Sequence, residues 1–305
     1  MSDPPPTLSI IVTIVSGGEA LRRCLDAIGA QRDAPPLEIL VPFDASAGLS
    51  ADVRRAYPSI RFLELGVLPT RRPPGSPAGQ HELYDRRRAA GLAAARGGLV
   101  AILEDRGAPR SDWASTMVRL HRGHPHAVIG GAVESVSPDS LNRAFHLCDF
   151  ERYSLPFESG PRTSISDVNV CYTRQAVETT RAVWTVRFHE SRVHAALREV
   201  GTTLFLSSEA VVDHRTSYDS LWRLLPERAA WGRLFGALRA AELSWGRRVG
   251  YVLAGPVLPF VLLVRHGRAQ WRKRRLASFL RLVPLMLPLL LAWTVGEVWG
   301  TLTGR

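Results

Sequence analysis

Lysine and cysteine are scarce in this chain, and each scarcity excludes a class of function. Of its 39 basic residues, only Lys273 is a lysine, so the formal net charge of +11 comes almost entirely from arginine. These arginines are not interleaved with aromatic residues and form no known nucleic-acid-binding module, so a nucleic-acid partner is not expected. The cysteines (Cys24, Cys148 and Cys171) are odd in number and widely spaced. They form neither a metal-binding pattern nor a disulfide framework, which favours a reducing compartment.

Three further features are missing. Residues 1–7 are polar and proline-rich and lack the apolar stretch of a secretory signal, so we expect a disordered N-terminus and no signal peptide. No Gly-x-Gly-x-x-Gly follows the first apolar strand, which argues against an enzyme of the dinucleotide-binding type. No uncharged apolar run reaches the roughly twenty residues that a transmembrane helix requires.

Short apolar runs that alternate with helical patterns are present instead. They predict an α/β fold with a mostly parallel sheet flanked by helices. The predicted strands are 8–15, 37–41, 60–65, 99–103, 127–136, 203–207 and 210–212, and the predicted helices are 49–57, 82–96, 112–121, 140–152 and 189–200. Residues 66–80 and 154–166 are expected to be loops, and Leu21, Leu25 and Ile28 recur at helical spacing after the first strand.

The run 99–105 ends a buried strand with two adjacent acids, Glu104 and Asp105. Ligands of open α/β sheets bind at the carboxyl ends of parallel strands. Two carboxylates at such a place are costly unless they meet a cation, a ligand or hydrogen-bond donors. The run therefore indicates either a site for a sugar nucleotide or metal–diphosphate, or a solvated acidic loop after a core strand.

The C-terminal part differs in character from the rest. Residues 221–281 carry thirteen basic residues and only two acids, and they surround an apolar segment. Segments 249–264 and 282–296 are uncharged but short, and each contains two prolines. Because arginines flank the first segment on both sides, we expect a re-entrant or interfacial hairpin at a membrane with anionic lipids rather than two ordinary spans. The alternative is a pair of buried core helices.

Several motifs follow one another in a characteristic order. They are LSIIVTIVSGGEALRRCLDAI from Leu8, Asp44-Ala-Ser, the helix from Arg88 to Gly97, Leu103-Glu104-Asp105, Asp112-Trp113, Gly130-Gly131, Asn169 to Tyr172, His189-Glu190 and Val212-Asp213-His214. In this order, over about residues 8–240, the chain resembles the family 2 glycosyltransferases with the GT-A fold. The end, from Ala292 to Gly300, also resembles the membrane-associated end of bacterial members.

The resemblance implies a catalytic domain over residues 8–220, a basic amphipathic helical linker over 221–248 and membrane-associated helices with an arginine-rich loop over 249–305. It implies an inverting transfer of a sugar from a nucleotide-sugar donor to a lipid-linked or cell-envelope glycan acceptor. It further implies a place at the inner (cytoplasmic) membrane, with the catalytic domain facing the cytoplasm. Two alternatives remain open: a catalytically inactive GT-A-like nucleotide-binding or scaffold protein at the membrane, and another nucleotide-binding α/β enzyme such as a nucleotidyltransferase.

The resemblance also implies roles at the donor diphosphate. Asp105 stands where the family's Asp-x-Asp motif supplies its acids, with Glu104 beside it and Arg106 in place of the third acid. Either Asp105 and His214 hold a divalent Mg or Mn ion, or Arg106 itself meets the phosphate and the metal is dispensable. For His214, a structural role is the alternative.

The remaining implied roles concern the nucleotide and the acceptor. Asp44 corresponds to a strand-end acid that binds the base or ribose, although Phe43 replaces the first acid of the usual pair; a turn residue is the alternative. Arg88 corresponds to a nucleotide-contacting arginine, and a solvated arginine is the alternative. Glu190 is the candidate general base, because an inverting transfer needs a carboxylate to accept the acceptor's proton; a plain glutamate at a helix start is the alternative. Asn169 and Tyr172 are expected to shape the acceptor pocket.

Overall fold

The computed structural model describes residues 5–304 and divides into two compact units. Unit 1 comprises Gly79–Glu134, Tyr153–Arg215 and the described part of Met1–Pro74. Unit 2 comprises Gly75–Ala78, Ser135–Arg152 and the described part of Thr216–Arg305. Of the segment predicted to be disordered, residues 1–4 lie outside the described residues.

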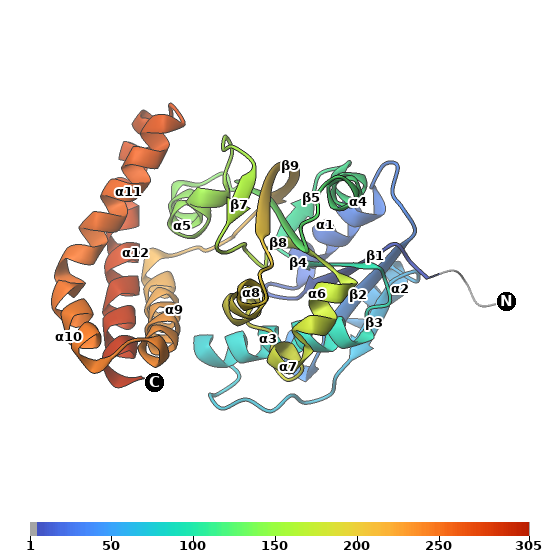
Figure 1. Cartoon of the computed structure of the whole chain (residues 1–305), viewed down its shortest axis with the longest axis horizontal. Coiled ribbons are helices and arrows are strands. Elements are labelled where there is room, and N and C mark those ends of the chain that lie inside the picture. The colour runs from blue at the N-terminus through green and yellow to red at the C-terminus, as the bar shows by residue number, and fades with distance from the viewer. Residues whose placement is uncertain (1–4, 305) are drawn as a thin grey trace. The chain divides into compact units, whose positions relative to one another are not determined.

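The described elements alternate between strands and helices through most of unit 1 (Figure 1). The strands are β1 (Leu8–Thr13), β2 (Leu37–Phe43), β3 (Arg61–Glu64), β4 (Leu99–Glu104), β5 (Gly107–Pro109), β6 (Val128–Ser135), β7 (Gly160–Arg162), β8 (Asn169–Thr173) and β9 (Leu204–His214). The helices are α1 (Gly18–Gly29), α2 (Ala51–Ala56), α3 (Pro77–Ala94), α4 (Trp113–Gly123), α6 (Arg174–Thr179), α7 (Arg181–Trp184) and α8 (Glu190–Glu199).

The strands form one sheet in the order β3-β2-β1-β4-β8-β6-β9-β5, with β7 also paired to β9. The first four neighbours are parallel, as in a series of βαβ units. The β4–β8, β8–β6, β9–β5 and β9–β7 pairs are antiparallel. The α/β class is confirmed, but the expected mostly parallel sheet is wrong: the sheet is mixed, with a parallel half and an antiparallel half.

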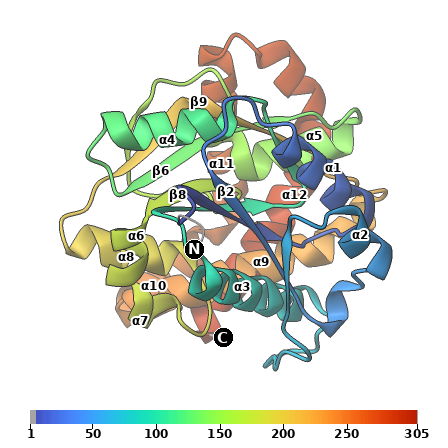
Figure 2. The same ribbon diagram turned by 90° about the vertical axis from the view of Figure 1, so that its right-hand side faces the viewer.

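Helices cover both faces of the parallel half, which explains why all six residues of β1 are buried. Helix α1 buries Leu21, Cys24, Leu25 and Ile28 against the sheet. Helix α4 packs on the same face, through residues such as Trp113. The opposite face receives α3, and Figure 2 shows α3 and α4 on either side of the strands. A strand that is covered on both faces needs apolar side chains on both, which gives the continuous apolar run seen in the sequence.

Three local predictions for unit 1 need correction. The two strands predicted at 203–207 and 210–212 are one strand, β9 (Leu204–His214), which continues through Ser208 and Glu209 although these two side chains reach the surface. The predicted loop 154–166 contains the short strand β7. Helix α3 begins at Pro77, five residues before the predicted start and inside the predicted loop 66–80. Proline is favoured at the first turn of a helix, where its missing N–H costs nothing.

Unit 2 is helical over most of its length. It contains α5 (Ser140–Phe150), the long α9 (Leu221–Glu242), α10 (Trp245–Ala254), a 3₁₀ turn at Gly255–Val257, α11 (Leu258–Arg272) and α12 (Leu276–Thr303). Its core includes Phe145, Leu224, Phe279, Met286 and Leu289.

Glycines let α9 and α12 approach closely. Gly232 and Gly236 of α9 lie against the backbone of α12, and Gly296 and Gly300 of α12 lie against the backbone of α9. Any added Cβ atom would collide with backbone atoms at all four positions. The two helices therefore pack through facing Gly-x-x-x-Gly motifs, a geometry common between helices in membranes.

The prolines affect the two apolar segments differently. The first is interrupted by the 3₁₀ turn Gly255–Val257, which contains Pro256, as expected. The second is not broken, because α12 continues through Pro284 and Pro288 for 28 residues. Residues Trp245–Arg272 and Leu276–Thr303 are each long and apolar enough to cross a membrane, and most of each apolar stretch is not buried. The alternative of two buried core helices therefore does not fit.

Candidate active site

Two of the predicted site residues follow the carboxyl ends of parallel strands. Asp44 comes directly after β2, while Glu104 closes β4 and Asp105 follows it. Because β1 lies between β2 and β4 in the parallel part of the sheet, these ends share one edge. This edge is where open α/β sheets bind ligands.

Asp44 is held from two directions. Its carboxylate accepts hydrogen bonds from the backbone N–H and hydroxyl of Ser46, and Arg87 Nε donates to it at 2.7 Å. Both side chains of the Asp44–Arg87 pair are only 2% exposed. Burial opposes ionisation of Asp44, but Ser46 and Arg87 outweigh it and lower the pKa. Asp44 therefore caps a turn, which is the alternative role predicted for it from the sequence. Its contact with a nucleotide stays a prediction.

Arg88 is buried among three carboxyl groups, of which Asp85 is buried and Glu104 and Asp167 are partly buried. Its Nη2 atom is 2.7 Å from Glu104 Oε1, and its Nη1 atom is 2.8 Å from Asp167 Oδ2 and 3.8 Å from Asp85 Oδ1. Arg88 is 4% exposed, so the alternative of a solvated arginine is wrong. A guanidinium can serve several carboxylates at once, because its five N–H donors point in fixed directions.

Glu190 opens α8 beside this cluster and is partly buried. Burial, followed by the nearby negative charge of Asp167, raises the pKa of Glu190, although Arg88 opposes this shift. Burial also raises the pKa of Glu104, with Arg88 opposing and Asp167 adding to the shift. The structure thus brings the predicted Glu104, Arg88 and Glu190 into one electrostatic group. A carboxyl with a pKa raised toward neutrality is the kind of group that enzymes use for proton transfer near pH 7.

A second layer of charge lies behind this cluster. Arg187 Nη2 is 2.9 Å from Asp85 Oδ2, and His189 Nε2 is 3.2 Å from the same oxygen. Burial raises the pKa of Asp85 to about 7. Burial, followed by the charge of Arg187, lowers the pKa of His189 to about 4, so His189 is neutral at pH 7.

Asp105 faces inward rather than toward the strand-end cluster. It is completely buried, and its two carboxylate oxygens accept the backbone N–H groups of Ser16 and Gly17 at 2.6–3.2 Å. Gly17 and Gly18, with φ angles of 67° and 51°, occupy the left-handed region that glycine adopts most readily. Asp105 therefore fastens the β1–α1 loop.

These residues do not fit a divalent metal. The oxygens of Asp105 are engaged by backbone N–H groups, and Glu104 is engaged by Arg88. His214 is 2% exposed and lies opposite Gly107 in the β5–β9 pair. Within residues 5–304, no three His, Cys, Asp or Glu side chains come together in a way that could hold a metal ion. Among the described residues, Asp105 and His214 therefore lack the further side-chain ligands that a bound metal ion would need.

Arg106 lies beside the same loop. Its Nε atom donates to the Ser16 hydroxyl at 2.7 Å, and its side chain is partly exposed. Ser16 is exposed and stands next to the N-terminus of α1. The sequence predicted two ways to bind a diphosphate, through a metal held by Asp105 and His214 or directly through Arg106. Only the contact from Arg106 leaves the observed hydrogen bonds of Asp105 intact.

Asn169 and Tyr172 do not line an acceptor pocket. Asn169 is fully buried, and its amide bonds the Trp113 indole and the carbonyls of Ala132 and Ala210. The hydroxyl of Tyr172, which is 1% exposed, is 2.9 Å from Nε2 of the buried His194. Both residues fasten elements of the core, so this expectation is wrong.

Sequence reasoning missed four members of the charged group: Asp85, Arg87, Asp167 and Arg187. Asp85 and Arg88 are three residues apart on one helix, a spacing that places them on one face and could have suggested a pair. Asp167 lies before β8 and carries no comparable local signal, since β8 reaches β4 only through long-range antiparallel pairing.

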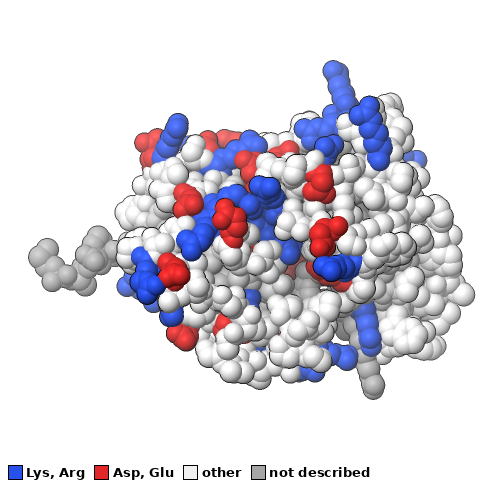
Figure 3. Space-filling view, turned by 180° about the vertical axis from the view of Figure 1, so that it is seen from behind, with Lys and Arg blue, Asp and Glu red and all other residues white. Residues whose placement is uncertain are grey.

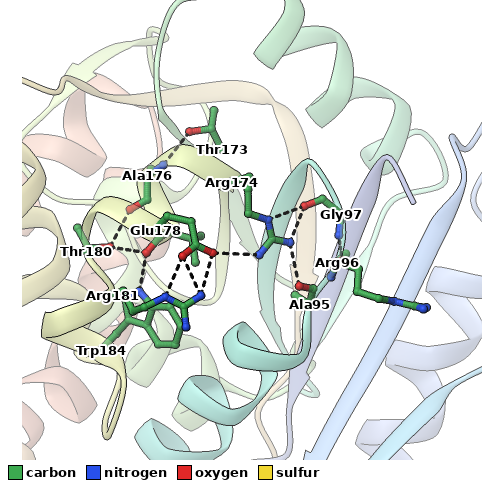
Figure 4. Close-up of polar contacts among 12 residues, drawn as sticks. Ala95, Arg96, Gly97, Thr173, Arg174, Ala176, Glu178, Thr180, Arg181 and Trp184 are labelled. Carbon is green, nitrogen blue, oxygen red and sulfur yellow. Dashed lines mark hydrogen bonds and ion pairs between the residues drawn. The ribbon is translucent and has the colours of Figure 1, made fainter. Parts of the chain in front are cut away.

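Another charged network lies at the other end of the strands (Figure 4). Arg174 follows β8 and donates to the carbonyls of Ala95 and Gly97, which precede β4. Glu178 pairs with Arg181 at 2.7 Å on the same side. Because its contacts go to carbonyls and neighbouring helix residues, this network fastens a connection and offers no second active site.

Comparisons with known proteins give no family assignment. No protein-family model and no curated protein matches the chain. Among solved structures, the chain matches the crystal structure of S. aureus TarS 1–349 at 14% sequence identity, covering 95% of this chain and 90% of that chain, with a TM-score of 0.49.

Proposed function

We propose that this chain is an inverting glycosyltransferase that moves a sugar from a nucleotide-sugar donor to a lipid-linked or cell-envelope glycan acceptor. The observation that carries the proposal is the buried Arg88–Glu104 ion pair at the carboxyl edge of the parallel strands, with Glu190 at the start of α8 close enough for its charge to interact with that of Arg88. Such an edge is the usual place for a nucleotide in an α/β sheet. The ordered motifs from Leu8 to His214 support the same family.

In this proposal Glu190 accepts the proton of the acceptor hydroxyl while that oxygen attacks the anomeric carbon. The bond from the anomeric carbon to the diphosphate breaks, and the leaving group takes the electron pair. Arg88 and Asp167 set the charge around Glu190, and the raised pKa makes its carboxylate a stronger base than a solvated one. Arg106 meets the charge that develops on the diphosphate, because a guanidinium suits bidentate phosphate contact. No step uses a metal.

The test is transfer from a panel of nucleotide sugars by the purified full chain, with and without a chelator. We expect Glu190→Gln to lower turnover by about a hundred- to ten-thousand-fold while donor binding is retained. Glu199→Gln, at the exposed end of the same helix, is the matched control and should behave like the wild type. Parallel loss of donor binding and turnover in Glu190→Gln would make Glu190 a binding or structural residue. Complete loss of turnover with the chelator would refute the metal-free assignment.

The internal hydrogen bonds of Asp44 and Asp105 favour a second candidate function. Both carboxylates are taken up by internal contacts, as expected if the fold binds a nucleotide without transferring a sugar. An inactive nucleotide-binding or scaffold protein would bind a nucleoside diphosphate in a thermal-shift assay, yet it would show neither transfer nor donor hydrolysis.

A further inference from the structure

An open groove on α11 combines an apolar half with a basic half. It has a volume of about 710 Å³ and is lined by Phe260, Val261, Val264, Arg265, Arg268 and Arg272, together with Ala269. The three apolar side chains are 54–55% exposed. From residue 260 to residue 272 the stripe extends about 18 Å along the helix, at 1.5 Å per residue.

The three arginines of this groove have no counter-charge of their own. No ion pair to Arg265, Arg268 or Arg272 occurs in the described part of the chain, and all three are exposed. The sequence contains no Asp or Glu between Glu242 and Glu297. Lys273, by contrast, is 2.9 Å from Glu151 and already paired. The groove therefore concentrates unbalanced positive charge at one end of an apolar stripe.

The surroundings extend the same pattern. Figure 3 shows a broad surface without charged side chains over the C-terminal helices, with basic side chains gathered where Figure 1 places the α11–α12 connection. Trp271, at this end of α11, is 68% exposed. Tryptophan beside arginine is typical of the level at which lipid head groups lie.

We propose that this groove binds an anionic membrane phospholipid, with its phosphate on Arg265, Arg268 and Arg272 and an acyl chain along Phe260, Val261 and Val264. Arginine binds phosphate through paired N–H donors, and an exposed apolar stripe gains free energy when hydrocarbon covers it. The change from apolar to basic along one helix face matches the change from acyl chain to head group. The site is distinct from the carboxyl cluster and does not depend on glycosyl transfer.

The test uses the full chain in a neutral detergent and follows its thermal unfolding as lipid is added. Phosphatidylglycerol should raise the midpoint by mass action, and phosphatidylcholine at the same concentration should raise it much less. The triple variant R265Q/R268Q/R272Q should bind phosphatidylglycerol on the order of a hundredfold more weakly, from roughly fivefold per arginine near an anionic surface. The control R32Q/R122Q/R143Q removes three exposed arginines elsewhere and should keep the shift.

Each other outcome contradicts the proposal. Equal shifts with the two lipids would mean that only the hydrocarbon is recognised. An equal shift with inorganic phosphate alone would mean a free-anion site. A triple variant that keeps its phosphatidylglycerol shift, while unfolding at the wild-type temperature without lipid, would place the lipid elsewhere. If V261S/V264S binds phosphatidylglycerol as tightly as the wild type, the acyl-chain half of the proposal fails.

Discussion

Two consecutive arginines of α3, Arg87 and Arg88, hold the ends of three strands and so fix much of the geometry of the site. Arg87 donates to Asp44 after β2 and, at 2.6 Å, to the carbonyl of Ile14 after β1. Arg88 contacts Glu104 at the end of β4. Buried charges are tolerated only when they are paired and hydrogen-bonded. These two arginines of α3 thus fix the geometry of the site, and their burial makes the site electrostatically costly.

The burial of the Glu190 carboxyl should have a measurable effect on the free energy of unfolding. A carboxyl whose pKa is raised by folding destabilises the native state above its ordinary pKa, because the unfolded chain ionises more readily. Glu190→Gln removes this effect, so we expect the variant to be more stable than the wild type by about 1 kcal/mol or more at pH 8. The difference should disappear below about pH 4, where the carboxyl is protonated in both states. Urea unfolding of both proteins at pH 4 and pH 8 checks this, and a pH-independent difference would contradict the cause given.

Asp105 should prove structural when it is replaced. In Asp105→Asn the amide nitrogen cannot accept an N–H group, so at least one contact to the β1–α1 loop is lost in a fully buried place. We expect a loss of about 1–3 kcal/mol in unfolding free energy, typical of a buried donor left unsatisfied. The exposed Asp112→Asn is the control and should unfold like the wild type. Unchanged stability together with lost transfer would instead place Asp105 in direct contact with the donor.

At the scale of elements, the sequence predicted what is local and missed what is long-range. The apolar runs 8–15, 37–41 and 99–103 form β1, β2 and β4, because a strand covered on both faces favours an uninterrupted apolar run. Residues 60–65 form β3, which lies at the edge of the sheet and is only partly buried. The antiparallel pairing of β8 with β4 and β6 has no local pattern, and Asp167 was missed for the same reason. Helix α12 was predicted to break at its prolines, but its packing in unit 2 outweighs their local preference.

The contact between α9 and α12 leads to a prediction at this scale. Gly232→Ala or Gly296→Ala places a methyl group against backbone atoms that cannot move aside as a flexible side chain could. We expect either change to lower the thermal stability of the full chain by several degrees or to prevent its recovery in folded form. Gly250→Ala in α10 is the matched control: nothing lies within 4 Å of the added Cβ atom, and alanine favours a helix. Equal behaviour of all three variants would mean that the close approach of α9 and α12 is unimportant.

At the scale of the molecule, the C-terminal helices are part of a folded unit. Helix α12 packs against α9 and contributes Phe279, Leu282, Met286 and Leu289 to a core shared with Leu224 and Phe145. Deleting residues 249–305 therefore removes the partner of α9 and exposes apolar surface that remains on the chain. A truncated protein that aggregates would accordingly say little about membranes, so membrane topology needs a test on the intact chain.

The orientation of the connection between α11 and α12 provides that test. Lys273, Arg274 and Arg275 join the segments Trp245–Arg272 and Leu276–Thr303, each of which is long and apolar enough to cross a membrane. Moving so many cations across a bilayer is unfavourable, so we expect this connection to stay on the cytoplasmic side, where unit 1 is also expected. Gln270 is 3% exposed and a poor labelling site, whereas Ala277 is exposed near the start of α12. With Cys24, Cys148 and Cys171 replaced, Ala277→Cys should resist a membrane-impermeant thiol reagent in intact cells and react after lysis. Labelling in intact cells would mean that Trp245–Arg272 crosses the membrane, and the basic groove on α11 would then face the outer leaflet.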